Sequence, residues 1–249
     1  MEEGSTKAEA RRPVGSLRAW ISRLAETDRL AIALPERDLR FEIAAISKRL
    51  DGIKATLFPH PGGHAIPIVS GIVSSRAWIA EAMGVAPGDV LECYGRAASS
   101  PIPCNEVATG ACQEIVHEDV DLTRLLPVPT HNEFDSGPYI TAGLLILRNP
   151  KTGHQNVSIH RCQVSGPREI GILLLPRHAL AFFDAAEAEG VALEMALVVG
   201  VDPLTLLASQ AIAPIDQDEL EIAGALHGRA RRNIAGTHRR ALRGHACAA

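Results

Sequence analysis

The sequence predicts an α+β protein, and three observations lead to that fold class. Of its 249 residues, 46% are hydrophobic and 22% are charged, a balance typical of globular domains. Residues 16–115 mix helical and strand patterns without any repeat. Further along, strands punctuated by Pro and Gly give way to an alternation of strand and helix, which predicts a mixed sheet with flanking helices.

The first expected helix begins after Ser16, a residue type that caps helix N-termini. Leu17, Trp20, Ile21 and Leu24 follow at three- and four-residue spacing and therefore share one helical face. We expect that face to belong to the core. The polar residues before it predict a frayed N-terminus.

A second helix is expected over residues 42–50, with Ile43, Ile46 and Leu50 directed inward. It is followed by a short apolar run at residues 55–58, which predicts a strand.

A further strand is expected over residues 66–73, directly before another helix. Ser74 or Ser75 can cap this helix, which runs to Met83. Gly84 then ends it, because glycine readily adopts the left-handed conformation of a C-terminal cap.

Residues 112–147 predict strands interrupted by Pro and Gly, and residues 139–147 predict one long apolar strand. The segment 149–153 reads NPKTG, which is typical of a hairpin turn. Residues 155–165 then return as a polar strand. We expect these two strands to pair along their length.

The remaining pattern predicts a strand, a helix, a strand and a helix, over residues 170–175, 176–189, 192–201 and 202–209. Asp202 is the expected N-cap of the last helix, and Pro203 takes its first position. This alternation completes the mixed sheet with helices on its faces.

Composition excludes several classes of protein. Lys and Arg total 25 against 29 Asp and Glu, a net charge of −4, which disfavours general nucleic-acid binding. No apolar run reaches the length of about 18 residues that a membrane span needs, and the N-terminus lacks the apolar core of a secretion signal. Five cysteines without any C-x-x-C pair favour neither a disulfide framework nor a zinc ribbon. A cytoplasmic protein is expected.

The polar strand carries polar side chains on both of its faces, which is unusual for a strand flanked by apolar ones. Alternation along a strand gives it two faces, which carry Asn156, Ser158 and His160 on one side and Val157, Ile159 and Arg161 on the other. One interpretation is a solvent-exposed edge strand. The other is a strand whose amide, hydroxyl and guanidinium groups line a pocket for an anionic ligand.

Two polar residues elsewhere extend the second interpretation. His178 lies at a predicted helix start, where backbone amides favour an anion, although a cap or surface residue is equally consistent with that place. Glu219 lies in an acidic stretch that also reads as a solvated turn. Together with Asn156 they offer oxygen and imidazole ligands suited to Mg²⁺ or Mn²⁺ bridging a phosphate. Sequence spacing does not show whether they converge.

Seven motifs follow one another along the chain: VDLTRLLPVPT (120–130), GPYITAG (137–143), NVSIHRCQ (156–163), PRH (176–178), GVDP (200–203), LAS (207–209) and ELEIAGAL (219–226). In order and composition, these motifs resemble those of the UbiD family of decarboxylases. The resemblance covers residues 16–228. It implies a flexible N-terminus (1–15), an N-terminal mixed α/β domain (16–115), an incomplete FMN-binding split β-barrel with flanking helices (116–228) and a basic tail foreign to the family (229–249).

The resemblance also implies cofactors: prenylated FMN, a Mn²⁺ or Mg²⁺ ion that holds its phosphate, and a nearby K⁺. The implied divalent-metal ligands are Asn156, His178 and Glu219. The implied K⁺ site uses oxygens around Val157, Ala208, Ser209 and Ala211, with Glu219 shared. The implied cofactor-binding residues are Thr141, Asn156, Ser158, Ile159, His160, Arg161, His178, Ser209, Gln210 and Glu219.

The implied activity is reversible, non-oxidative decarboxylation of an aromatic or α,β-unsaturated carboxylic acid. Arg161 is the implied catalytic residue, which grips the substrate carboxylate with the planar geometry that Lys lacks. The resemblance further implies a flavin prenyltransferase that supplies the cofactor, and a homo-oligomer. Neither a membrane nor a nucleic acid is an expected partner.

Residues 229–249 depart from the family pattern, with six Arg, two His and no acidic residue. The family's segment with the catalytic glutamates and its dimerisation domain have no counterpart in this sequence. We therefore expect a truncated or frame-shifted member that is inactive alone, with Arg161 unpaired in an open cleft. Two alternatives remain open: a flavin- and metal-binding fragment or partial subunit without catalysis, and a nucleic-acid-binding protein that uses its basic tail.

Overall fold

The computed structural model describes residues 12–234. Its first elements are α1 (Leu17–Glu26), β1 (Leu30–Ile32), α2 (Glu42–Leu50), β2 (Ala55–Phe58), η1 (Pro61–Gly63), β3 (Ile68–Ser70), α3 (Arg76–Met83), η2 (Pro87–Asp89), α4 (Val90–Ser99), β4 (Asn105–Val107), η3 (Ala111–Gln113) and α5 (Leu122–Leu125). The later ones are β5 (Tyr139–Ile140), β6 (Leu144–Arg148), β7 (Gln155–Ile159), β8 (Cys162–Gly166), β9 (Glu169–Ile172), α6 (His178–Ala188), β10 (Met195–Val198), α7 (Pro203–Ala208), α8 (Glu219–His227) and β11 (Arg232–Ile234). The predicted α+β class is confirmed.

Local capping signals place several helices where the sequence predicts them. Ser16 Oγ accepts a hydrogen bond from Ala19 N at 3.2 Å, and Trp20 is buried in the helix that follows. Ser75 caps α3 in the same way, and Gly84 ends that helix in the left-handed conformation. The structure also confirms the predicted bounds of α2 and β2.

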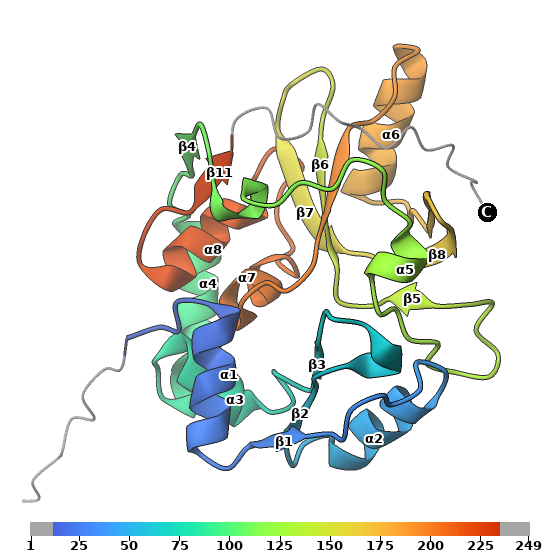
Figure 1. The fold of residues 1–249 in the computed structure, drawn as a ribbon. Coiled ribbons are helices and arrows are strands. Elements are labelled where there is room, and N and C mark those ends of the chain that lie inside the picture. The colour runs from blue at the N-terminus through green and yellow to red at the C-terminus, as the bar shows by residue number, and fades with distance from the viewer. Residues whose placement is uncertain (1–11, 235–249) are drawn as a thin grey trace, which may run out of the picture.

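The strands form small sheets instead of one continuous sheet. Within residues 12–234 the strand orders are β1-β2-β3, β10-β6-β7, β5-β8-β9 and β11-β4. Most pairs are antiparallel, while β1 with β2 and β11 with β4 run parallel. Figure 1 shows β6 and β7 near the centre of the molecule, with α6 to one side and α7 and α8 to the other.

The prediction of one continuous hairpin over residues 139–165 is wrong. Ile140 pairs with Cys162 in one sheet, whereas Leu144 pairs with Ile159 in another, so both strands break at the same level. Three residues, 141–143, then face only two, 160–161, and we call these five residues the seam. Gly143 permits the break, because a Cβ there would lie 2.7 Å from Leu197 Cδ1.

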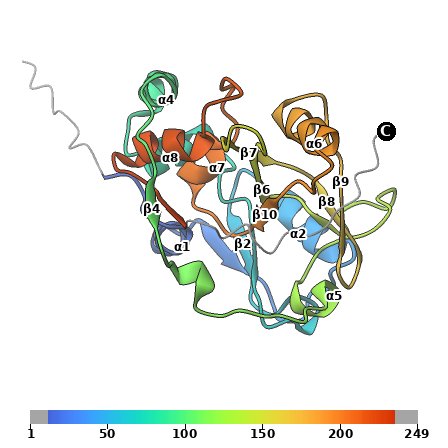
Figure 2. The same ribbon diagram turned by 90° about the horizontal axis from the view of Figure 1, so that it is seen from above.

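The largest core joins the two ends of the described chain. Trp20 and Trp78 from α1 and α3 pack in one cluster with Leu204 of α7 and Ile222 of α8. Figure 2 shows α1, α4, α7 and α8 gathered on the same side of the molecule. The segments 16–115 and 116–228 therefore share a core, which holds α7 and α8 against the N-terminal helices.

Smaller clusters attach the remaining helices to the sheets. Leu145 and Leu147 of β6 pack against Phe182 of α6, and all three are fully buried. Cys162 of β8 is buried in a separate cluster against the α5 segment. The cysteines of the described part, Cys93, Cys104, Cys112 and Cys162, form no disulfide with one another.

The buried carboxylate of Asp202 contacts both the end of α8 and the segment that follows it. Asp202 Oδ1 accepts from Leu204 N at 3.0 Å as the predicted cap of α7, and it also lies 2.9 Å from His227 Nε2 at the end of α8. Asp202 Oδ2 lies 3.3 Å from Arg231 Nη2. Residues 229–234 of the predicted basic tail are thus part of the fold, while residues 235–249 lie outside the described range. None of the helices in residues 12–234 is long and apolar enough to cross a lipid bilayer.

Candidate functional site

The first residue of α8 joins that helix to the free edge of β7. Glu219 Oε2 accepts a hydrogen bond from Val157 N at 2.7 Å, and Oε1 accepts from Asn156 Nδ2 at 2.8 Å. The Glu219 side chain is buried, with 3% of the residue exposed. The interpretation of this residue as part of a solvated turn is therefore wrong. So is the solvent-exposed edge strand, because α8 covers the start of β7.

Asn156 lies at the meeting point of three elements. Its Nδ2 is 2.8 Å from Glu219 Oε1 and 3.5 Å from Nδ1 of His178, the first residue of α6. The structure thus brings together the three side chains that the sequence predicts as ligands of one divalent ion. They come from β7, α6 and α8, which are distant in sequence.

A polar row continues from Asn156 along β7. Ser158 Oγ donates to Asn156 Oδ1 at 3.2 Å and lies 3.0 Å from His160 Nε2. The other ring nitrogen of His160 lies 3.2 Å from the Leu173 carbonyl. The predicted shared face of Asn156, Ser158 and His160 is confirmed, and one line of hydrogen bonds connects the buried end of β7 to the seam.

The electrostatics at Glu219 favour a bound cation. Burial raises the pKa of Glu219 to about 7, and this effect exceeds the lowering by its hydrogen bond from Val157. No Lys or Arg within residues 12–234 forms an ion pair with this carboxylate. A buried carboxylate without a cationic neighbour is costly, and a metal ion would supply the missing charge.

The donor set fits a hard divalent ion only if Asn156 takes part. No cluster of three or more His, Cys, Asp or Glu side chains that could hold a metal occurs within residues 12–234. Carboxylate and amide oxygens with one imidazole form a set that Mn²⁺ and Mg²⁺ accept. Oδ1 of the Asn156 amide would bind the ion only after the amide turns over, because Oδ1 accepts from Ser158 while Nδ2 faces Glu219 and His178.

Arg161 lies in the seam and has a partner, contrary to the expectation of an unpaired guanidinium. Its Nη2 lies 2.8 Å from Asp135 Oδ1, and its guanidinium carbon stacks 4.3 Å from the centre of the Tyr139 ring. The ion pair lowers the pKa of Asp135. The Arg161 side chain remains 58% exposed, so another carboxylate can approach it.

The other predicted cofactor residues do not join the polar row by hydrogen bonds within the described chain. Buried Ser209 donates from Oγ to the Leu206 carbonyl at 2.7 Å and accepts from Gln210 Nε2 at 3.1 Å. Gln210 lies beside a largely apolar cavity of about 310 Å³ between α3, α4 and α7. Thr141 is exposed in the seam, and half-buried Ile159 pairs with Leu144.

Sequence reasoning missed Asp135 and the bridge that Gln155 makes to Asp218, with Gln155 Nε2 2.8 Å from Asp218 Oδ2. No sequence motif marks Asp135, Gln155 or Asp218 as functional, because each of them meets its partner only in the folded chain. Gln155 and Asp218 directly precede Asn156 and Glu219, and that adjacency is the one signal the sequence holds.

Comparison with protein families gives two matches along the chain. Residues 105–242 match the 3-octaprenyl-4-hydroxybenzoate carboxy-lyase Rift-related domain, UbiD. Residues 21–98 match the corresponding N-terminal domain, UbiD_N. The first match continues beyond Gly228, where we expected the resemblance to end.

Curated relatives include decarboxylases of different substrates. The chain is 37% identical over 162 residues to an anhydromevalonate phosphate decarboxylase of Methanothermobacter thermautotrophicus, covering 65% of this chain and 38% of that protein. It is 31% identical over 207 residues to a phenolic acid decarboxylase of Bacillus subtilis, covering 78% and 44%. An uncharacterised Rhodospirillum rubrum protein, encoded 5′ of cooM, is 36% identical over 91% of this chain and 50% of its own length. The chain thus spans half or less of these relatives.

Solved structures agree with the sequence matches. The UbiD-class enzyme HmfF from Pelotomaculum thermopropionicum in complex with FMN superposes with a TM-score of 0.85 at 45% identity, covering 88% of this chain and 50% of that one. A 3,4-dihydroxybenzoic acid decarboxylase, AroY, from Klebsiella pneumoniae superposes with a TM-score of 0.81 at 27% identity, covering 90% and 51%. Each of these chains is about twice as long as the part matched.

Proposed function

The chain belongs to the UbiD family of carboxy-lyases, and from that membership we propose that it forms the flavin- and metal-binding part of a decarboxylase. The proposed reaction is the non-oxidative decarboxylation of an aromatic or α,β-unsaturated carboxylic acid. The observation that carries the proposal is the meeting of Asn156 and His178 with the buried carboxylate of Glu219, which has no cationic partner among residues 12–234.

The relatives support both the cofactor and the substrate class. HmfF holds FMN in one structure, and an evolved dimeric form of it holds prenylated FMN. Phenolic acid and 3,4-dihydroxybenzoic acid decarboxylases act on aromatic acids. We propose that the sheets β10-β6-β7 and β5-β8-β9 of this chain belong to the split barrel that binds prenylated FMN.

In this proposal Asn156, His178 and Glu219 would hold Mn²⁺ or Mg²⁺, which would supply positive charge for the flavin phosphate. Backbone and side-chain oxygens near Val157 and Ser209 hold K⁺. Prenylated FMN, when bound, supplies an electron sink for decarboxylation. Thr141, Ser158, Ile159 and His160 lie along the cofactor, and the contacts of Ser158 with Asn156 and His160 orient the polar side chains of this row.

Arg161 binds the substrate carboxylate in the seam. Tyr139 supports one face of its guanidinium and Asp135 holds one edge, so the remaining donors stay open to a second carboxylate. Asp135 is a poor proton donor, because its ion pair with Arg161 lowers its pKa and keeps it ionised near neutral pH. We therefore propose that the chain alone binds the cofactor but does not complete multiple turnovers.

The experiment that tests the proposal is a flavin titration of the purified chain, followed by FMN fluorescence, with Mn²⁺ present and with Mn²⁺ removed by a chelator. We expect saturable FMN binding that weakens when Mn²⁺ is removed, since the metal connects the phosphate to Glu219. Absence of FMN binding under both conditions would contradict the proposed function.

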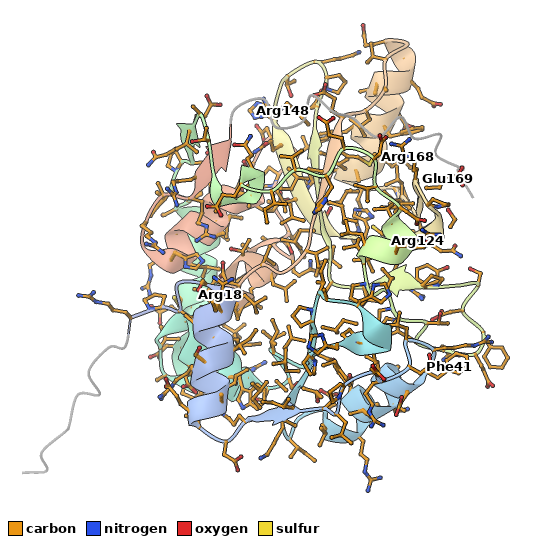
Figure 3. The ribbon with its side chains drawn as sticks, viewed as in Figure 1. Arg18, Phe41, Arg124, Arg148, Arg168 and Glu169 are labelled. Carbon is orange, nitrogen blue, oxygen red and sulfur yellow. The ribbon has the colours of Figure 1, made fainter. Side chains whose placement is uncertain are left out.

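Arg161→Met is expected to weaken binding of an aromatic carboxylate such as benzoate by about 10- to 100-fold, the value of a charge-assisted hydrogen bond. The measurement is a benzoate titration of the FMN-loaded chain followed by the flavin spectrum. Arg168→Met is the matched control, because Arg168 is also an exposed arginine 2.9 Å from an aspartate, Asp119. Figure 3 shows Arg168 at the turn before β9. Equal losses in both variants would argue against a carboxylate site at Arg161.

A further inference from the structure

A second bridge joins β7 to the start of α8, beside the one that Glu219 makes. Gln155 is buried, with 5% of the residue exposed, and its Nε2 donates to Asp218 Oδ2 at 2.8 Å. Asp218 Oδ1 meanwhile accepts from Leu220 N at 2.8 Å as the N-cap of α8. The two bridges are consecutive on both elements, since Gln155 precedes Asn156 and Asp218 precedes Glu219.

Arg148 fixes the orientation of the Gln155 amide. It is the register partner of Gln155 on β6, and its Nη2 donates to Gln155 Oε1 at 3.2 Å. A guanidinium only donates and a carboxylate only accepts, so the amide must present its oxygen to Arg148 and its nitrogen to Asp218. Figure 3 shows Arg148 at the end of the β6–β7 hairpin.

The paired bridges fix the position of α8 along β7. Successive strand side chains point to opposite faces, yet Gln155 and Asn156 both reach α8, because the helix start lies against the free edge of the strand. A shift of α8 by one residue would break both bridges together. The distance between Glu219 and Asn156 therefore depends on the Gln155–Asp218 bond.

We propose that Gln155 and Asp218, with the amide oriented by Arg148, form a clamp that positions Asn156 and Glu219 for the cation. Gln155 is a positioning residue that touches neither the ion nor the substrate. Its role toward the ion rests on the proposed function. Its role in placing Glu219 against β7 does not, and it can be measured without any metal.

Two variants break the clamp from opposite ends, and a third is the matched control. Gln155→Met keeps the length of the side chain but removes its donor and acceptor. Asp218→Ser keeps an N-cap but is too short to reach Gln155. Gln217→Met removes a different side-chain bond at the same helix start, from Gln217 Nε2 to the Ala98 carbonyl at 3.0 Å, which involves neither candidate ligand.

The first readout is amide hydrogen exchange at Val157, measured by NMR on the metal-free chain. Val157 N donates to Glu219 Oε2, so its exchange reports how firmly α8 is held against β7. We expect exchange about tenfold faster in Gln155→Met and Asp218→Ser, since losing a bond of about 1.4 kcal/mol changes an opening equilibrium by that factor. Gln217→Met should leave it unchanged.

The second readout is the Mn²⁺ dissociation constant, from the electron paramagnetic resonance signal of free Mn²⁺. We expect both clamp variants to bind Mn²⁺ about 10-fold more weakly, as loss of an outer-shell partner typically does, and the control to bind as the original chain does. The proposal is overturned if a folded clamp variant, either Gln155→Met or Asp218→Ser, leaves the exchange rate of the Val157 amide unchanged. Faster exchange with no Mn²⁺ binding by the original chain supports the clamp and contradicts the proposed function instead.

Discussion

Replacing Glu219 with Gln is expected to weaken Mn²⁺ binding by more than about 100-fold, beyond the 10- to 100-fold typical of losing an outer-shell partner. Glu219 is the only carboxylate among the three candidate ligands, and burial keeps water from replacing it. The substitution removes that charge from the ligands themselves, while the neighbouring Asp218 carboxylate remains. Calorimetric titration of the purified chain with Mn²⁺ measures the change.

The folded state should tolerate this substitution. Gln has the same shape, and its amide oxygen can still accept from Val157 N or from Asn156 Nδ2. Glu221→Gln is the matched control, since Glu221 lies in the same first turn of α8 and contributes no candidate ligand atom. Equal Mn²⁺ affinity in the original chain and Glu219→Gln would show that the ion binds elsewhere or not at all.

Elements with signals inside their own sequence could be predicted closely. Ser16 and Ser75 mark helix starts because their hydroxyls cap amides three residues away, and Gly84 marks an end because it adopts positive φ. Such signals act within one turn and need no knowledge of the rest of the fold. The short strand β1 and helix α4 were not predicted: β1 has only three residues, and Asp89, at the N-cap position of α4, makes no side-chain capping bond there.

The seam could not be predicted from the sequence. Within the apolar run of residues 139–147, Gly143 is the one local sign of an interruption, and a single glycine does not show where each half of the strand pairs. The break arises because Ile140 pairs into one sheet while Leu144 pairs into another, a choice that depends on β8, β9 and β10. The partner of Arg161 was missed for the same reason, since Asp135, in the loop before β5, comes near Arg161 only when β5 pairs with β8.

In the candidate site, too, local features could be predicted from the sequence and long-range contacts could not. The polar face of β7 followed from alternation, and the structure confirms it in the bonds from Ser158 to Asn156 and His160. The meeting of Asn156 with Glu219, 63 residues away, depends on how α8 packs against α7 and the N-terminal helices. Spacing in the sequence carries no information on that packing, and only the family resemblance indicated it.

Asp202→Asn is expected to lower the free energy of unfolding by about 3 kcal/mol at neutral pH, the low end for breaking a buried ion pair. Asn can still cap α7, so the change isolates the charge that faces His227 and Arg231. The loss should lower the midpoint of thermal unfolding by about 6–12 °C for a chain of this size. Differential scanning calorimetry measures it, and an unchanged midpoint at pH 7 would contradict it.

The dependence on pH gives a second test of the same pair. Burial would raise the pKa of Asp202, but His227 and Thr205 lower it to about 2, below the usual 3.8. A carboxyl with a lowered pKa stabilises the fold above its unfolded pKa and loses that contribution as pH falls from about 4 toward 2. The original chain should lose about 2 kcal/mol of stability over this range through Asp202. Asp202→Asn should lack that loss, whereas Asp121→Asn, at the exposed N-cap of α5, should retain it.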